Sequence, residues 1–217
     1  MITVILPTRN DVAVGRVIEE IRVLPFEPSI IVTDYKSTDG TREAVLSKGA
    51  ILIDEPLKGK GIAVRNVMEA IPGGYILLLD ADFTYPARYL TDILRELHSG
   101  ADVVIGVRSS REEGSMSFLN RVGNFLLSLL ASTLFGYRVR DVCSGMWGFR
   151  AKAVGGFVLT SNGFTLEVDF FTNAVRNGCK IAQIPITYRA RLDGSKPKLN
   201  IWDGFKIGWF IIRRWMR

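Results

Sequence analysis

The stretch Tyr75–Pro86, YILLLDADFTYP, runs from four consecutive apolar residues directly into two aspartates, Asp80 and Asp82. A short, continuous apolar run of this kind is typical of a strand that is covered on both faces of its sheet. Carboxylates are costly to bury unless they are paired or bind a metal. The stretch therefore predicts a buried strand whose carboxyl end carries a charged site.

Similar apolar runs alternate with helical patterns through the first half of the chain. The expected strands lie at Thr3–Leu6, Ile30–Thr33, Ala50–Ile53, Tyr75–Leu79 and Val103–Val107. The expected helices lie between them, at Val12–Leu24, Thr41–Ser47, Ile62–Ile71 and Ala87–His98. This alternation predicts an α/β fold in which helices sandwich a mostly parallel sheet.

Polar segments follow four of these strands. PTRND comes after the first, DYKSTDGT after the second, DEPLKGKG after the third and DADFTYP after the fourth. In open parallel sheets, ligands bind in the crevice beyond the carboxyl ends of the strands. The convergence of four polar strand ends therefore predicts a binding pocket at that edge.

The chemistry of two of these strand ends points to a metal and a phosphate. Asp80 and Asp82 suit Mg²⁺ or Mn²⁺, which complete their coordination with substrate phosphates and water. The alternative is a helix-capping aspartate beside a solvated one. Lys60 lies in the segment LKGKG ahead of a helix, a place suited to phosphate binding, although the spacing is not that of a Walker loop. A flexible loop is the alternative there.

The second half of the chain is expected to be organised differently. Its sequence predicts a polar loop over Ser109–Ser117, an apolar helix over Phe118–Phe135, a helix over Leu166–Asn177, a strand over Lys180–Ile184 and a basic, turn-rich segment over 187–198. Five arginines flank the predicted pocket in sequence: Arg108, Arg111, Arg121, Arg189 and Arg191. Guanidinium groups bind phosphate bidentately. The alternative for each is a solvated surface arginine, and for Arg111 we favour that alternative.

The C-terminal residues predict an amphipathic helix. Trp202, Phe205, Trp209, Ile212 and Met216 recur at helical spacing and are accompanied by basic residues. Aromatic and basic side chains together suggest a helix that lies in a membrane interface, and a helix docked on the core is the alternative. The longest charge-free stretch, 122–137, is shorter than the roughly 20 residues of a spanning helix.

Composition narrows the classes of partner. The chain of 217 residues has a formal net charge of +6, which favours an anionic partner such as a nucleotide, a phosphate or an acidic lipid surface. Cys143 and Cys179 form no CxxC pair, so neither a disulfide framework nor a zinc site is expected. The N-terminus lacks the pattern of a signal peptide, and no signature of nucleic-acid binding is present.

Taken in order, these segments resemble the family 2 glycosyltransferases of the GT-A fold, specifically the dolichol-phosphate mannose synthase-like (polyprenyl-phosphate glycosyltransferase) branch. The resemblance covers nearly the whole chain. The segments that carry it are VILPTRND, TDYKSTDGT, GKGIAVRN, LLLDADFTYP, VIGVRS, RDVCSGMWGFR and RLDGSK.

The resemblance implies a role for several residues. Pro7, Thr8, Asp34 and Tyr35 would line the nucleotide pocket, and Asp80 and Asp82 would bind the metal and the donor diphosphate. Arg108, Arg121 and Arg191 would face the acceptor phosphate, and Asp141 is an acidic residue expected near the acceptor. Four positions depart from the usual pattern: Arg9, Asp11, Tyr35 and Thr84.

The resemblance also implies the activity. A hexose of the mannose or glucose type would pass, with inversion and with Mg²⁺ or Mn²⁺, from a GDP- or UDP-sugar to a polyprenyl (dolichyl) phosphate. We expect one Rossmann-like GT-A domain over 1–200, with a nucleotide-sugar half (1–108) and an acceptor half (109–200), then a membrane-interface helix over 201–217. The enzyme would act peripherally at the cytoplasmic face of a membrane, with or without a separate membrane subunit. The alternatives are a soluble transferase with a glycan or polysaccharide acceptor, and a non-catalytic sugar-nucleotide-binding subunit.

Overall fold

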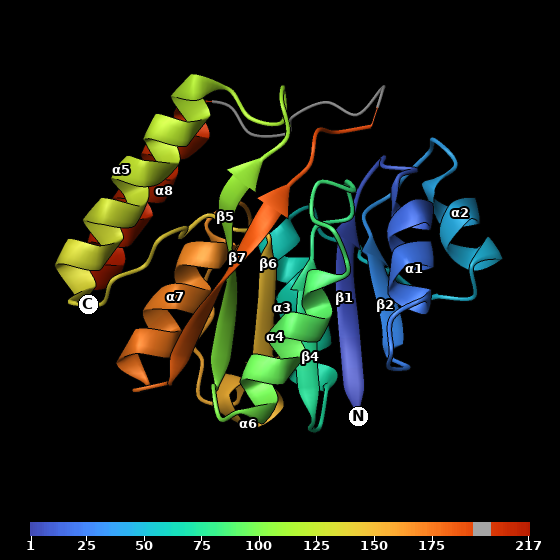
Figure 1. Ribbon diagram of the computed structural model, residues 1–217, viewed down its shortest axis with the longest axis horizontal. Coiled ribbons are helices and arrows are strands. Elements are labelled where there is room, and N and C mark those ends of the chain that lie inside the picture. The colour runs from blue at the N-terminus through green and yellow to red at the C-terminus, as the bar shows by residue number, and fades with distance from the viewer. Residues whose placement is uncertain (193–200) are drawn as a thin grey trace.

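The structure, a computed structural model, describes residues 1–192 and 201–217 (Figure 1). Within these residues seven strands form one sheet: β1 (Ile2–Thr8), β2 (Ser29–Asp34), β3 (Ile51–Asp54), β4 (Tyr75–Leu79), β5 (Val103–Arg111), β6 (Met146–Arg150) and β7 (Ile181–Tyr188). The helices are α1 (Val14–Arg22), α2 (Thr41–Ser47), α3 (Lys60–Ala70), α4 (Tyr89–His98), α5 (Phe118–Phe135), α6 (Ala151–Val154), α7 (Leu166–Arg176) and α8 (Ile201–Trp215).

The sheet has the strand order β3-β2-β1-β4-β6-β5-β7, and β6 alone runs antiparallel to its neighbours. One apolar cluster packs α1 and α4 on one face of the sheet, and a second packs α3, α7 and parts of α5 and α8 on the other. The strand of the opening stretch, β4, is buried at Ile76–Leu79. The predicted α/β sandwich with a mostly parallel sheet is therefore confirmed.

The parallel strands bring the predicted polar segments to one edge of the sheet. Thr8 at the end of β1 is level with Asp34 at the end of β2, and Asp34 is level with Asp54 at the end of β3. β4 pairs with the other side of β1, so Asp80 follows at the same edge. This edge lies at the top of Figure 1.

Three details of the second half differ from the sequence-based expectation. β6 was not predicted, because it is a five-residue strand that forms only between β4 and β5, which are distant in sequence. β5 continues to Arg111, into the predicted loop, and β7 continues to Tyr188, into the predicted basic segment, because these two strands pair with each other. The last part of that basic segment, 193–198, lies outside the described residues.

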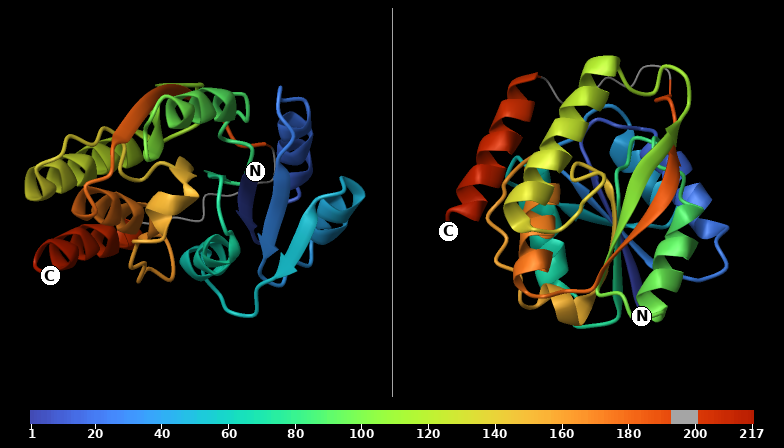
Figure 2. Two further views of the ribbon diagram at one scale, coloured as in Figure 1. Left: turned by 90° about the horizontal axis from the view of Figure 1, so that it is seen from below. Right: turned by 60° about the vertical axis from the view of Figure 1, so that its left-hand side comes forward.

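Helices α5 and α8 lie side by side at one end of the sheet (Figures 1 and 2), with Gly208 of α8 close to Leu127 of α5. Both expose large apolar side chains, which together we call the α5–α8 apolar surface: Phe118, Leu119, Val122, Phe125, Leu126 and Leu129 on α5, and Trp202, Phe205, Trp209 and Trp215 on α8, with Met216 directly after it. By length and composition, α5 is long and apolar enough to cross a membrane, and only 11% of the helix is buried. It was not predicted as a spanning helix because the charge-free stretch 122–137 is shorter than a span.

Candidate active site

Asp80 is held at the end of β4 by the turn that precedes β6. The Asp80 N–H donates to the Gly145 carbonyl at 3.2 Å, and the Gly145 N–H donates to the Tyr85 hydroxyl at 2.6 Å. A Cβ atom at Gly145 would lie 2.0 Å from Asp80 Oδ2. Only glycine therefore allows the two backbones to place this carboxylate so close to the turn.

Asp82 is held by the tight turn that follows it. Phe83 takes the left-handed conformation, with φ of 64°, and Thr84 then donates to Asp82 Oδ1 from its N–H at 3.2 Å and from its hydroxyl at 2.5 Å. Thr84 is fully buried. Thr84, one of the departures from the usual family pattern, thus orients the Asp82 carboxylate through these two hydrogen bonds. Arg191, from the segment after β7, pairs with Asp82 Oδ2 at 2.8 Å.

Lys60 joins Asp80 to a carboxylate that the sequence analysis missed. Its Nζ lies 2.5 Å from Asp80 Oδ1 and 2.5 Å from Glu167 Oε1. Burial disfavours the ammonium, but the two carboxylates outweigh burial and raise the pKa of Lys60 above its ordinary value. Burial, together with the nearby Asp80, raises the pKa of Glu167 although Lys60 opposes this. The site thus holds one lysine between two acids.

The residues predicted to line a nucleotide pocket lie at the ends of β1 and β2. Thr8 is buried, and its Oγ1 has no hydrogen-bond partner among the described residues. Pro7 precedes it on the same strand. Asp34 is fully buried, accepts from the Ser37 N–H at 3.1 Å and pairs with Arg42 at 3.1 Å. In this structure the Asp34 carboxylate therefore holds the loop after β2 as well as standing at the predicted pocket.

Two of the departures from the family pattern lie together. The Arg9 guanidinium is 5.0 Å from the centre of the Tyr35 ring, within the range of a cation–π contact. The loops that carry them are joined by hydrogen bonds, from the Asn10 N–H to Ser37 Oγ at 2.7 Å and from the Asp11 N–H to Thr41 Oγ1 at 2.8 Å. The two departures thus pack against each other in the loops that follow β1 and β2.

Arg108 and Asp141 form a buried bidentate pair. Arg108 Nε donates to Asp141 Oδ2 at 2.7 Å, and its Nη2 donates to Oδ1 at 2.6 Å. Both side chains are almost fully buried. Burial alone would raise the pKa of Asp141, but the Arg108 guanidinium outweighs burial and holds the pKa below its ordinary value. The roles predicted for both at the acceptor stay predictions. In this structure the guanidinium of Arg108 and the carboxylate of Asp141 hydrogen-bond to each other.

Arg111 is not the fully solvated arginine that we favoured from the sequence. It lies at the end of β5, and its Nε is buried without a hydrogen-bond partner among the described residues. Burial lowers the pKa of Arg111, and so do the nearby charges of Arg108 and Arg121. Arg121 is exposed on the first turns of α5. The three arginines therefore lead from the buried pair onto the helix that carries the α5–α8 apolar surface.

The carboxylates fit a divalent cation that is shared with a substrate. Each carboxylate already pairs with a basic side chain, Asp80 with Lys60 and Asp82 with Arg191. Among the described residues no three His, Cys, Asp or Glu side chains gather into a ready metal cluster. Two carboxylates without a protein cage are the usual arrangement for Mg²⁺, which takes its remaining ligands from phosphate and water.

Known proteins share both the sequence and the fold. Residues 3–156 match the family described as Glycosyl transferase family 2. The chain is 37% identical to glycosyltransferase AglJ of Haloferax volcanii, over 94% of this chain and 68% of that protein. It is 32% identical to a dolichyl-phosphate hexose transferase of the same organism, over 90% of this chain and 86% of that protein.

A solved structure has the same fold. Glucosyl-3-phosphoglycerate synthase from Mycobacterium tuberculosis, in complex with Mn²⁺, UDP and glucosyl-3-phosphoglycerate, superposes with a TM-score of 0.76 at 21% identity. The match covers 99% of this chain and 78% of that one. With the family match and the relatives, it confirms the predicted GT-A architecture. The chain therefore belongs to glycosyl transferase family 2 and is a glycosyltransferase.

Proposed function

We propose that this glycosyltransferase moves a hexose from a nucleotide diphospho-sugar to a polyprenyl phosphate at a membrane surface. The observation that carries the proposal is the line of arginines from Arg108 through Arg111 to Arg121. It begins at Arg108, which donates to the Cys143 carbonyl just before the Gly145 turn that holds Asp80, and ends on an exposed apolar helix. A lipid phosphate needs both features, because its headgroup is anionic and its chain is apolar. The related dolichyl-phosphate hexose transferase supports this choice of acceptor.

The donor is proposed to bind at the carboxyl ends of β1, β2 and β4. Thr8 would offer the nucleotide its hydroxyl, which has no hydrogen-bond partner among the described residues, and Tyr35 with Arg9 would face the base. Pro7 and Asp34 complete the nucleotide pocket as their positions imply. Lys60 lies at the diphosphate, where its ammonium balances the leaving group. The half formed by 1–108 is thus proposed as the donor half, although Glu167 from the other half contacts Lys60.

Asp80 and Asp82 would hold Mg²⁺ or Mn²⁺ together with the donor diphosphate. When bound, the ion would neutralise the charge that develops on the leaving nucleoside diphosphate. The glucosyl-3-phosphoglycerate synthase of M. tuberculosis, which has the same fold, binds Mn²⁺ together with UDP, which supports this assignment. Lys60 and Arg191 already balance the two carboxylates, so we infer that they turn toward the phosphates as the donor enters.

The residues of the chain do little proton chemistry in this proposal. A phosphate monoester is ionised near neutral pH, so its oxygen attacks the anomeric carbon without a strong base. The new bond joins that carbon to the acceptor oxygen, the bond to the donor diphosphate breaks, and the anomeric configuration inverts. Arg111, Arg121 and Arg191 orient the acceptor phosphate, and Arg108 stays with Asp141. Orientation and charge stabilisation are sufficient to supply most of the rate increase.

The membrane position follows from the α5–α8 apolar surface. We propose that 201–217 lies in the interface beside α5 and that the enzyme acts peripherally at the cytoplasmic face. The two free cysteines are consistent with a reducing compartment. A separate membrane subunit is not needed for this arrangement, because the two helices already offer an apolar face.

A donor-by-acceptor panel tests the proposal. GDP- and UDP-sugars are offered with polyprenyl phosphate or with soluble glycans, in Mg²⁺, Mn²⁺ or chelator, and products are separated into organic and aqueous phases. We expect a lipid-linked product that disappears in chelator. A product found only on soluble glycans would favour a soluble transferase. Donor binding without any product would favour a non-catalytic subunit.

Replacing Arg111 with glutamine is expected to raise the KM for polyprenyl phosphate by about 10- to 100-fold, since a charge-assisted hydrogen bond contributes roughly 1.5–3 kcal/mol. The KM for the donor should stay within about twofold, and the melting temperature should not fall, because the change relieves the crowding of Arg111 by Arg108 and Arg121. Steady-state kinetics check this, with Arg95→Gln on α4 as the control. Equal effects on both substrates would contradict the assignment.

A further inference from the structure

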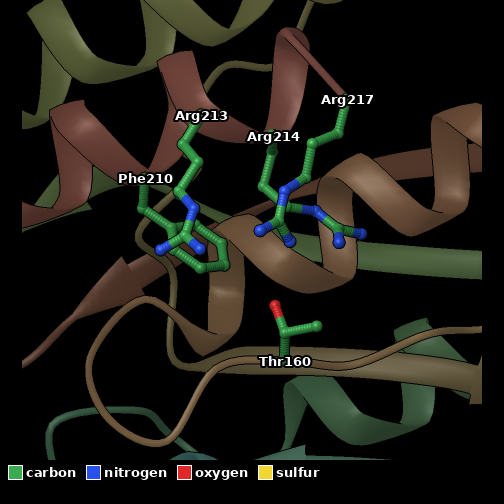
Figure 3. A pocket seen from close by; sticks show the side chains of 5 residues that line it. All are labelled: Thr160, Phe210, Arg213, Arg214 and Arg217. Carbon is green, nitrogen blue, oxygen red and sulfur yellow. The ribbon is translucent and has the colours of Figure 1, made fainter.

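A second basic site lies at the far end of α8 from the carboxylates. A cavity of about 140 Å³ is lined by Thr160, Phe210, Arg213, Arg214 and Arg217. Figure 3 shows the side chains of Arg213 and Arg214 on α8, and of Arg217 just after it, reaching toward Thr160, which lies on the segment between α6 and α7. α8 begins at the edge of the sheet that carries the active site and ends away from it (Figure 1). The cavity is therefore not part of the donor pocket.

The cavity is built by a buried carboxylate rather than by loose surface side chains. Asp169 on α7 is fully buried and pairs with Arg214 at 3.3 Å. The same carboxylate accepts from the N–H of Thr160 at 2.5 Å and from the N–H of Ser161 at 2.8 Å. Arg214 also donates from Nε to the Thr172 hydroxyl at 3.2 Å. Asp169 thus holds both walls of the cavity, α8 through Arg214 and the segment between α6 and α7 through Thr160 and Ser161.

Positive charge is in excess around this carboxylate. Arg214 is almost fully buried, and burial lowers its pKa, opposed by Asp169 and assisted by the charges of Arg176 and Arg217. Arg213 lines the cavity as well. Asp169 balances one of these cations. An anion in the cavity would balance the charge of the remaining arginines and would accept paired hydrogen bonds from their guanidinium groups.

The position of the arginines points to a lipid. Arg213 lies one helical turn beyond Trp209, and Arg217 lies one turn beyond Arg213, so both follow the edge of the exposed aromatic stripe. Trp209 belongs to the α5–α8 apolar surface. A helix that lies in an interface keeps its aromatic side chains among the lipids and its basic side chains at the headgroups. The cavity is also smaller than the roughly 300 Å³ or more of sites for larger ligands.

We propose that Arg213, Arg214, Arg217 and Thr160 form a binding site for the phosphate of an anionic phospholipid headgroup. The site anchors the far end of α8 on the membrane while the other end carries the active site. This inference rests on the proposed function, because it requires that the α5–α8 apolar surface contacts a bilayer. It adds a lipid-recognition site that is separate from the acceptor site.

Vesicle co-sedimentation of the whole chain tests the site. Vesicles of phosphatidylcholine with phosphatidylglycerol are compared with vesicles of phosphatidylcholine alone. Arg213→Gln with Arg217→Gln is expected to weaken binding to the anionic vesicles by about thirtyfold, at about fivefold for each arginine near the surface. The control, Arg16→Gln with Arg95→Gln, removes two exposed arginines from α1 and α4 and should change binding by less than about threefold.

A second variant places an acid in the cavity. Thr160→Asp should weaken binding to anionic vesicles, whereas Ser47→Asp, an exposed position on α2, should not. Far-UV circular dichroism confirms that each variant is folded. Product formation by the unaltered enzyme in detergent tests the proposed function separately. A negative result in the vesicle experiment can therefore be told apart from a failure of the proposed sugar transfer.

Three results would overturn the inference. The first is equal loss in the cavity variants and their controls, which would mean diffuse attraction by net charge. The second is equal binding to both kinds of vesicle, which would mean that the apolar surface acts alone. The third is competition by millimolar inorganic phosphate with no preference for anionic vesicles, which would identify a free phosphate as the ligand.

Discussion

Replacing Asp80 with asparagine is expected to lower kcat/KM for sugar transfer by about 100- to 1,000-fold while the fold stays intact. Asparagine has the same shape, so it fits beside Gly145, where the carboxylate leaves no spare room. The loss follows because the change removes charge that would hold the metal and the diphosphate, and preorganised groups of this kind contribute about that much to rate. Lys60 keeps Glu167 as its partner.

The measurement is transfer rate against metal concentration, with the melting temperature beside it. Asp92→Asn is the control, since Asp92 forms an exposed pair with Arg95 on α4. We expect the Asp80 variant to need more metal as well as to react more slowly. A rate within about threefold of the unaltered enzyme, at the same metal concentration, would contradict the proposed role of Asp80.

Replacing Arg108 with methionine is expected to lower the free energy of unfolding by about 3–5 kcal/mol. The change leaves the Asp141 carboxylate buried with no cation, and breaking one side of a buried pair costs about this much. Arg95→Met breaks an exposed pair and should cost no more than about 1 kcal/mol. Denaturant unfolding measures both. Adding Asp141→Asn to Arg108→Met should recover part of the loss, because it removes the unpaired charge.

The pH dependence of that loss has a definite sign. In the unaltered protein the pKa of Asp141 lies below its unfolded value of about 3.9, so its contribution is complete above that value and is lost as the pH falls through the folded pKa. In the Arg108 variant, protonation removes the buried charge. Without the guanidinium, burial raises the pKa of Asp141 in this variant, so the difference in unfolding free energy should begin to narrow above pH 4, as the pH falls through that raised pKa, and should narrow further below about pH 4. A difference below 1 kcal/mol at pH 7 would contradict the structural role of the pair.

Local pattern was enough to predict the strand and the two carboxylates of the opening stretch. Ile76–Leu79 is a continuous apolar run, so its burial on both faces was readable from neighbouring residues alone. The position of Asp80 and Asp82 at the carboxyl edge of the sheet followed from the general geometry of parallel sheets. β6 was not predictable in this way, since its partners are set by pairing between distant segments.

Long-range contacts also explain what was missed in the site. Glu167 stands within an apolar helical pattern, and only the fold brings it to Lys60, 107 residues away. An acid in the first turn of a predicted apolar helix was the one available signal. Arg111 looked like a loop residue because the sequence does not show that β5 continues to it beside β7. Thr84 was identified only as a departure from the usual pattern, whereas in the fold it donates to Asp82.

The most direct test of the central claim compares a polyprenyl phosphate with the polyprenol of the same chain length, with the donor and metal held constant. We expect the phosphate to be glycosylated and the alcohol to react at least about a hundredfold more slowly, because in the proposed mechanism the arginines around Arg111 bind the acceptor phosphate, while Asp141 stays paired with Arg108. Equal rates with the two lipids, or transfer to the alcohol alone, would contradict it.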